Sequence, residues 1–348
     1  MHDAEHGAIH LTDNGVSSSM LPFFKSAAPL KSLVLATLLS LLTSQQALAA
    51  DLATLRVANQ KSLLKTLLQV SGELKDVPYD IQFSEFPSAA PLGEALNAGA
   101  VDIGALGDAP YVFALGAGAP LKVVSITHAQ GRFTTALLVS KNSPIKTVAD
   151  LKGKRIVTGR GSIGHYLAIR ALHEAGLKTS DVTFINLLPS ESRLLLDSGE
   201  ADAWATWDPY TTISISQSDA RVLVSGSELL SNHLYLAATG KAIEGKRVQL
   251  DDFVARVERA FNWTNAHPEE YAAAQARVTG LPLEVHLSVA KATKMQRTLI
   301  DDTIIQGLQA TADTYLAEGI LGKPIDVSTG FDKRFNAARP QIAQAASQ

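Results

Sequence analysis

The segment TGRGSIGHY, residues 158–166, combines glycines, a serine and a histidine at a spacing that could do chemistry. Gly159, Gly161 and Gly164 follow the G-x-G-x-x-G pattern, in which glycines let the backbone approach a dinucleotide pyrophosphate at a helix N-terminus. Such a site also needs an acidic residue at the end of the next strand, and the predicted strand 182–187 ends in Asn186 and two leucines, without a carboxylate. The loop therefore predicts an anion site at a helix start but no nicotinamide site.

The same loop raises the alternative of a secreted serine hydrolase that uses Ser162. Arg160 stands where the G-x-S-x-G nucleophile elbow requires its first glycine. Ser162 and His165 are three residues apart on one predicted helix, a poor geometry for a proton relay. We expect Ser162 to cap that helix and its hydroxyl to reach a ligand, with the polar tip of His165 beside it.

Two aspartates and two tryptophans mark further candidate positions. Asp108 and Asp208 each precede a proline at the predicted start of a helix, where an aspartate caps the helix or orients backbone donors around a ligand. Trp204 and Trp207 lie three residues apart in the predicted strand 201–207 and so face opposite sides. We expect Trp204 in the core and Trp207 in the wall of a cleft.

The elements that position these residues follow the pattern of an α/β protein, in which short apolar runs alternate with amphipathic stretches. Strands are predicted at 54–60, 77–86, 101–107, 121–127, 155–159, 182–187 and 201–207. Helices are predicted at 63–74, 88–99, 110–119 and from 163 to Gly176, and a further predicted helix runs through Arg193. Ser62 is expected to cap the first of these helices. From about Asp251 the sequence predicts mainly helix, including 251–267 and 295–319.

An internal repeat relates two of these regions. Residues 96–109 and 196–209 align without gaps at an offset of 100, with identical residues at Leu96/Leu196, Gly99/Gly199, Asp102/Asp202, Ala105/Ala205 and Asp108/Asp208. Each copy reads as a helix end, a capping glycine, a buried strand and a loop that enters another helix. In parallel sheets ligands gather beyond the carboxyl ends of such strands. The repeat therefore predicts two similar lobes whose loops face each other across a cleft.

Length, composition and charge limit the classes of protein to which this chain can belong. The chain has 348 residues, exceeds one ordinary core, and has a net charge of −3, which favours neither nucleic acid nor a membrane surface as partner. It contains no cysteine, which excludes disulfides and thiol nucleophiles. Its histidines fall in no metal-binding spacing. We expect no metal, no cofactor and no catalytic residue.

Residues 1–49 are predicted to be a signal peptide that directs the protein to the periplasm. Lys25 and Lys31 precede the apolar stretch 33–42, and Ala47-Leu48-Ala49 forms the cleavage site. Ten apolar residues would span only about half of a bilayer core. The polar start of this segment suggests Met20 as the true initiator.

Several motifs resemble the aliphatic-sulfonate-binding proteins of bacterial sulfonate importers. They are ALNAGAVDIGALGDAPYVFALGAGAPLKVV (95–124), NSPIKTVADLKGKRI (142–156), GSIGHYLAIRALHEAGL (161–177), GEADAWATWDPY (199–210), SNHLYLA (231–237) and YLAEGILGKPIDV (315–327). Taurine-, nitrate- and thiamine-precursor-binding relatives share these signatures, so those ligands stay open as alternatives.

The resemblance implies a two-lobed type II periplasmic-binding-protein fold, with mixed α/β lobes joined by two crossing strands. Lobe I would comprise residues 50–131 and 235–348, and lobe II residues 132–234. The implied role is a monomer that binds a small organosulfonate between the lobes and hands it to an ABC permease. The implied ligand contacts are Gln60, Ser62, Gly107, Asp108, Ser162, Ile163, Gly164, His165, Trp207 and Asp208. Arg132, in HAQGRFTT, departs from the proline-rich crossing of sulfonate binders and could alter selectivity.

Overall fold

The computed structural model describes residues 54–131 and 135–337. The predicted signal peptide and Arg132 lie outside the described residues. Within the described ranges, no helix is long and apolar enough to cross a membrane.

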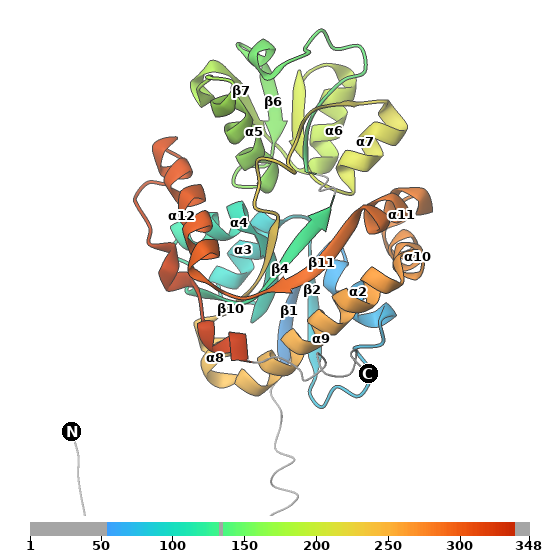
Figure 1. Cartoon of the computed structure of the whole chain (residues 1–348), viewed down its shortest axis with the longest axis vertical. Helices are drawn as coiled ribbons and strands as arrows, with labels where there is room; N and C mark the ends of the chain where they lie inside the picture. Colours follow the sequence, from blue (N-terminus) through green and yellow to red (C-terminus); the bar gives the residue numbers. More distant parts are fainter. Residues whose placement is uncertain (1–53, 132–134, 338–348) are drawn as a thin grey trace, which may run out of the picture. The chain divides into compact units, whose positions relative to one another are not determined.

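Two β-sheets organise the chain. The first has the order β11-β4-β10-β3-β1-β2 and comprises β1 (Leu55–Gln60), β2 (Ile81–Phe86), β3 (Ile103–Gly107), β4 (Leu121–Gly131), β10 (His233–Thr239) and β11 (Thr293–Thr298). The second has the order β7-β6-β8-β5-β9 and comprises β5 (Ala136–Val139), β6 (Arg155–Thr158), β7 (Thr183–Asn186), β8 (Ala203–Thr206) and β9 (Arg221–Ser225). We call the parts built around them lobe I and lobe II. Figure 1 shows lobe II in green to yellow, above lobe I.

Each sheet combines parallel and antiparallel pairs. In lobe I, β1 pairs in parallel with β2 and β3, whereas β10 and β11 join through antiparallel ladders. In lobe II, β6 pairs in parallel with β7 and β8, and β5 is antiparallel to β8 and β9. The chain leaves lobe I after β4 and returns to it at β10. The arrangement is the two-lobed, mixed α/β fold expected from the sequence.

Helices cover both faces of each sheet. Those of lobe I are α2 (Leu63–Val70), α3 (Ala89–Asn97), α4 (Asp108–Gly116), α8 (Gly240–Gly245), α9 (Arg247–Ala266), α10 (Pro268–Thr279), α11 (Leu283–Ala292) and α12 (Asp302–Ala317). Those of lobe II are α5 (Ile163–Glu174), α6 (Pro189–Ser198) and α7 (Tyr210–Ser218). In lobe I, α2, α8 and α9 bury their apolar residues against one face of the sheet, and α3, α4 and α12 against the other.

Two local predictions need correction. The continuous helix predicted over 295–319 is wrong, because Thr293–Thr298 pairs with β4 as a strand and α12 begins only at Asp302. The Asp301 side chain caps that helix by accepting from the N–H of Ile304. Ser62 precedes α2 as predicted, but its hydroxyl makes no cap hydrogen bond. The Asn59 side chain does so instead, accepting from the N–H of Leu64 at 2.9 Å.

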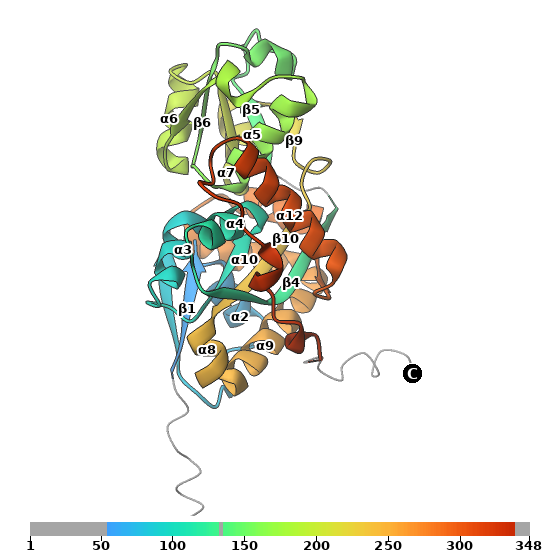
Figure 2. The same ribbon diagram turned by 90° about the vertical axis from the view of Figure 1, so that its left-hand side faces the viewer.

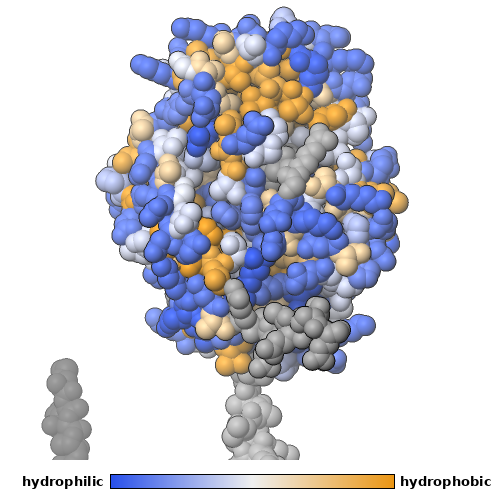
Figure 3. Space-filling model, viewed as in Figure 1, coloured by the Kyte–Doolittle hydropathy of each residue, from blue (hydrophilic) through white to orange (hydrophobic). Residues whose placement is uncertain are grey.

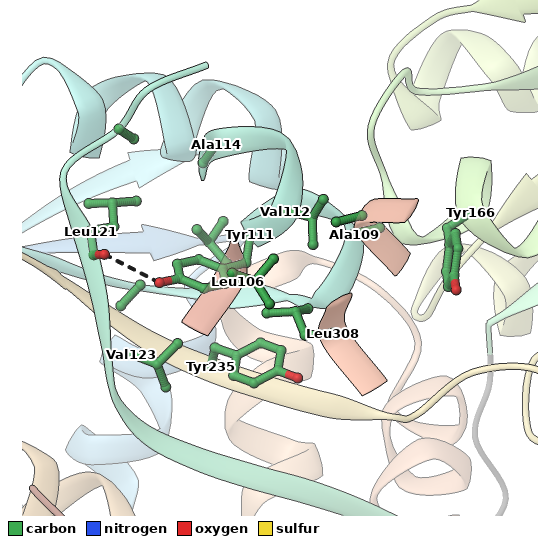
Figure 4. Packing of buried hydrophobic residues seen from close by; sticks show 14 of the residues in the cluster. Leu106, Ala109, Tyr111, Val112, Ala114, Leu121, Val123, Tyr166, Tyr235 and Leu308 are labelled. Carbon is green, nitrogen blue, oxygen red and sulfur yellow. Dashed lines mark hydrogen bonds between the residues drawn. The ribbon is translucent and has the colours of Figure 1, made fainter. Parts of the chain in front are cut away.

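One hydrophobic cluster extends across both lobes. It joins residues of β3, α4, β4, β10 and α12 in lobe I to Tyr166, Leu167 and Ile169 of α5 in lobe II. Figure 4 shows Tyr166 on the far side of this cluster from Leu121. In the same view, the hydroxyl of Tyr111 donates to the carbonyl of Leu121. Figures 1 and 2 both place α12 beside α4, with one end near lobe II. The lobes are therefore in apolar contact on the α5–α12 side.

On the face drawn in Figure 3, hydrophilic side chains cover most of the surface. The broadest apolar area of that view lies in its upper part, over lobe II. Leu194 of α6 and Val222 of β9 are among the exposed large apolar side chains of lobe II.

Candidate ligand-binding site

A cavity of about 340 Å³ lies between the lobes, and the first residues of five helices line it. The lining residues at these helix starts are Gln60, Lys61 and Leu63 for α2, Ala89 for α3, Gly107 and Asp108 for α4, Ser162 and Ile163 for α5, and Trp207, Asp208, Pro209 and Tyr210 for α7. Each helix N-terminus carries a partial positive charge and N–H groups without an intrahelical partner. Five such ends around one cavity make it suited to an anion.

The start of α5 offers the clearest donors. The Ser162 hydroxyl accepts from the N–H of His165 at 3.1 Å, so Ser162 is the N-cap that the sequence predicted. In the described part of the chain, the N–H groups of Ile163 and Gly164 donate to no protein acceptor. A Cβ on Gly164 would lie 2.4 Å from the carbonyl oxygen of Ala205, so only glycine lets α5 approach β8 this closely. Gly164 itself does not line the cavity, and it faces β8.

His165 points away from the cavity. Its side chain is buried, with 5% of the residue exposed, and its Nδ1 accepts from the N–H of Gly161 at 3.2 Å. The ring packs edge-on against Phe184 and beside Tyr315 of α12. Burial, helped by the charge of Arg160, lowers the pKa of His165 to about 4, so the imidazole is neutral near pH 7. His165 therefore holds the loop, and it is not among the residues that line the cavity; its predicted contact with a ligand stays a prediction.

The start of α4 places Asp108 in the cavity wall, with 3% of the residue exposed. The Ser231 hydroxyl, from the loop that precedes β10, donates to its Oδ2. Burial raises the pKa of the Asp108 carboxyl, against the opposing effect of hydrogen bonds from Ser231, Tyr235 and the backbone of His233. Asp108 therefore ties α4 to the returning strand β10.

The start of α7 is organised differently. The Asp208 carboxylate accepts from the N–H of Thr212 at 3.0 Å and from its hydroxyl at 2.8 Å, so Asp208 caps its own helix. The N–H groups of Tyr210 and Thr211 donate to the carbonyl of Trp207. Trp207 forms cavity wall with its ring edge-on to Tyr210, whereas Trp204 lies in the core with 1% exposed.

The start of α2 adds a cation that the sequence analysis missed. Lys61 and Ser62 both adopt left-handed backbone conformations, with φ of 49° and 60°. The N–H of Ser62 donates to the Glu85 carboxylate at 3.1 Å, and Ser62 does not line the cavity. Gln60 and Lys61 do, and among the described lining residues Lys61 is the only lysine or arginine.

Residues of α10, α11 and β11 also line the cavity, and the sequence had linked none of these elements to the site. These residues are Tyr271, Ala272, Gln275 and Thr279 of α10, His286, Val289 and Ala290 of α11, and Met295 of β11. Asn232 and His233 also line the cavity, between the lobes. Within the described residues, no group of three or more His, Cys, Asp or Glu side chains could hold a metal ion.

Comparison with known proteins places the chain in a family. The family described as NMT1/THI5 like matches residues 80–271. A protein of Escherichia coli K12 named as an aliphatic sulfonates-binding protein is 35% identical over 302 residues, which cover 85% of this chain and 93% of that protein. The chain belongs to the NMT1/THI5-like family. Within that family it is similar to the aliphatic-sulfonate-binding proteins that its motifs resemble.

Solved structures of the family agree with this placement. The alkanesulfonate-binding protein SsuA of Xanthomonas axonopodis pv. citri, solved bound to MOPS, is 30% identical, with a TM-score of 0.75 over 81% of this chain and 99% of that one. The periplasmic aliphatic sulphonate binding protein SsuA of Escherichia coli is 32% identical, with a TM-score of 0.73 over 80% of this chain and 92% of that one. The desulfurization enzyme DSZB shares the fold at 17% identity and a TM-score of 0.59.

Proposed function

We propose that this chain is the solute-binding component of an ABC importer, and that it binds one organosulfonate between its lobes. The observation that carries the proposal is the convergence of five helix N-termini on one cavity. A sulfonate has three oxygens that share one negative charge and accept hydrogen bonds in several directions. Each helix end stabilises such an anion by about 0.3–1 kcal/mol at an exposed site, and by up to about 2 kcal/mol where the ligand is partly buried.

The donors at the site are mainly neutral, which suits a permanently charged ligand. The N–H groups of Ile163 and Gly164 and the hydroxyl of Ser162 lie at one helix start, and Lys61 faces the cavity from the other lobe. A buried anion held by backbone dipoles needs no buried cation as partner. We expect Gln60, Gly107, Trp207 and Asp208 to complete the contacts.

The relatives support the cellular role in general terms, since the Escherichia coli protein is named as periplasmic and sulfonate-binding. We propose that cleavage after Ala49 releases the mature protein into the periplasm. There it would bind its ligand as a monomer, leave it chemically unchanged and deliver it to a permease. The hydrolase alternative is disfavoured by the place of His165, the histidine nearest to Ser162 in the sequence. Its ring Nδ1 accepts from the N–H of Gly161, and it is the backbone N–H of His165, not the ring, that donates to the Ser162 hydroxyl.

Isothermal titration calorimetry with pentanesulfonate tests the binding step. We expect one site per chain, and the sulfonate should be recovered intact. Ser162→Ala should weaken binding by about 0.5–3 kcal/mol, the range for one lost hydrogen bond to a neutral or charged acceptor. Ser198→Ala, an exposed serine of α6, serves as control and should leave the affinity unchanged. No heat and no thermal shift with any sulfonate, together with a response to a pyrimidine or to nitrate, would overturn the proposal.

A further inference from the structure

We propose that a second crevice, on the α5–α12 side of the molecule, is a binding site for a small oxyanion. This crevice has a volume of about 360 Å³ and shares no lining residue with the cavity described above. Lobe II contributes Arg160, His165, Ser180 and Asn186 to its lining, and lobe I contributes residues 318–320, which follow α12. A ligand bound there would therefore contact both lobes. The inference does not depend on the function proposed for the other cavity.

His165 supplies a buried hydrogen-bond donor at this crevice. The residue is 5% exposed, and because burial lowers the pKa of its ring to about 4, the ring is neutral near pH 7. Its Nδ1 accepts from the N–H of Gly161, so the ring proton resides on Nε2. That Nε2–H donates to no acceptor among the described residues. It keeps contact with open space, and the crevice is the space that His165 lines. An acceptor for this donor must therefore come from the crevice.

The other unengaged side chains of the lining are donors as well. The guanidinium of Arg160 makes no ion pair within the described ranges, although its charge is near enough to help lower the pKa of His165. The side chains of Ser180 and Asn186 likewise have no hydrogen-bond partner in the part of the chain that the structure describes. A guanidinium, an imidazole N–H, a hydroxyl and a side-chain amide all donate to oxygen, and the guanidinium binds charged oxygens most strongly. The shared preference of these groups is an oxyanion.

Glu318 is the one carboxylate among the described residues that line the crevice, and both of its oxygens are engaged. Its Oε1 lies 2.7 Å from Nε2 of His173, and its Oε2 accepts from the hydroxyl of Thr179. Both partners belong to lobe II, so Glu318 joins the lobes beside the crevice and leaves the guanidinium of Arg160 to a ligand. A cation placed there would instead meet Arg160 and the Nε2–H of His165. The arrangement therefore favours an anion.

Nuclear magnetic resonance of the histidine rings tests the proposal on the whole protein. The ¹⁵N-labelled protein is titrated at pH 7 with sodium sulfate, and sodium chloride at equal ionic strength is the reference. We expect the Nε2 signal of His165 to start as that of a neutral N–H and to shift saturably, with a dissociation constant on the order of 1 mM. The ring of His233 lines the other cavity and reports binding there. A saturable shift of His233 without one of His165 would overturn the second site.

The same titration with succinate identifies the source of the oxyanion. Tighter binding of sulfate would indicate an inorganic anion, whereas tighter binding of succinate would indicate the carboxylate of an organic acid, and either result supports the site. The absence of a saturable shift of His165 with both anions would overturn it.

Arg160→Gln locates the charge. Arg160 is exposed, so the variant should fold with an unchanged thermal midpoint, but its affinity for the anion should fall by about tenfold or more, because a charge-assisted contact is lost. The matched control is Arg277→Gln, an exposed arginine of α10 outside both linings, which should bind like wild type. Equal affinities of Arg160→Gln and Arg277→Gln would overturn the assignment.

Discussion

The two copies of the repeat, 96–109 in lobe I and 196–209 in lobe II, share a backbone frame. Gly99 and Gly199 both take a left-handed conformation, with φ of 67° and 78°. Asp102 accepts from the backbone and guanidinium of Arg56 on β1, and Asp202 accepts in the same way from Arg155 on β6. The repeat thus fixes how a helix ends and how the next strand joins its parallel neighbour in each sheet.

The copies diverge at their cavity ends. Asp208 caps its own helix through Thr212, whereas Asp108 binds Ser231, which lies 123 residues along the chain. Trp207 stands where the other copy has Gly107, and both line the cavity. The difference teaches that local geometry is shared by the repeat, while the role of each polar side chain is set by what the rest of the fold brings to it.

The largest expected difference between the copies lies at their strand-start aspartates. Asp102 is buried and also accepts from Lys246 at 2.6 Å, whereas Asp202 is a quarter exposed and pairs with Arg155. Asp102→Asn should lower the free energy of unfolding by about 3 kcal/mol, the low end for breaking a buried ion pair. Asp202→Asn should cost about 1 kcal/mol or less. Urea denaturation of both variants measures this, and equal losses would contradict the comparison.

The pH dependence of this difference has a defined sign. Burial of Asp102 is outweighed by hydrogen bonds from Arg56 and Lys246, so its folded pKa is lowered. Its stabilising contribution is therefore present at neutral pH and is lost as the pH falls toward the lowered pKa. The difference in free energy of unfolding between wild type and Asp102→Asn should therefore become smaller at acid pH.

The next effect concerns the helix caps. Asp208→Ala removes the acceptor for Thr212 at the start of α7 and should destabilise the protein by about 1 kcal/mol. Asp208→Asn keeps a side-chain oxygen that can accept from Thr212, so its loss of stability should be smaller than that of Asp208→Ala. Thermal unfolding of the two variants side by side checks this, and identical midpoints would argue against the cap.

Asp108 should show the opposite pH dependence to Asp102. Because burial raises its folded pKa, the folded state holds more protons than the unfolded state between the two pKa values. The free energy of unfolding therefore falls as the pH rises through that window, and Asp108→Asn removes this part of the decline. In urea titrations, the free energy of unfolding of Asp108→Asn should rise relative to that of wild type from about pH 4 upward. A constant difference at every pH would contradict the raised pKa.

The smallest effect is spectroscopic. If the lobes close on the ligand, the emission of Trp207 should change on binding. The emission of Trp204, which is buried, and of Trp263, which stacks on His267, should change little. A fluorescence titration of wild type against Trp207→Phe separates these contributions. Small-angle scattering of free and loaded protein reports the accompanying change in radius of gyration. An unchanged signal in Trp207→Phe would show that another tryptophan reports binding.

Local signals were sufficient for much of this architecture. Apolar runs and capping glycines such as Gly99 placed β1, β3 and α3, and the repeat predicted equivalent loops in two lobes. The strand Thr293–Thr298 was missed because it is mostly polar, with Met295 as its only strongly apolar residue, and only pairing with β4 makes it a strand. The orientation of the His165 ring could not be predicted, because the ring packs beside Tyr315, which lies 150 residues away in the sequence. The α10–α11 wall likewise exists only through long-range packing.

The hydrophobic cluster shared by α5, α4 and α12 has a consequence for how the protein unfolds. Lobe II is an insertion between β4 and β10, and its helix α5 completes the same apolar interior as Tyr111 and Tyr315 of lobe I. Melting either lobe alone would expose part of that interior to water. We therefore expect a single cooperative heat-absorption peak, with equal calorimetric and van't Hoff enthalpies, from two lobes that look separable.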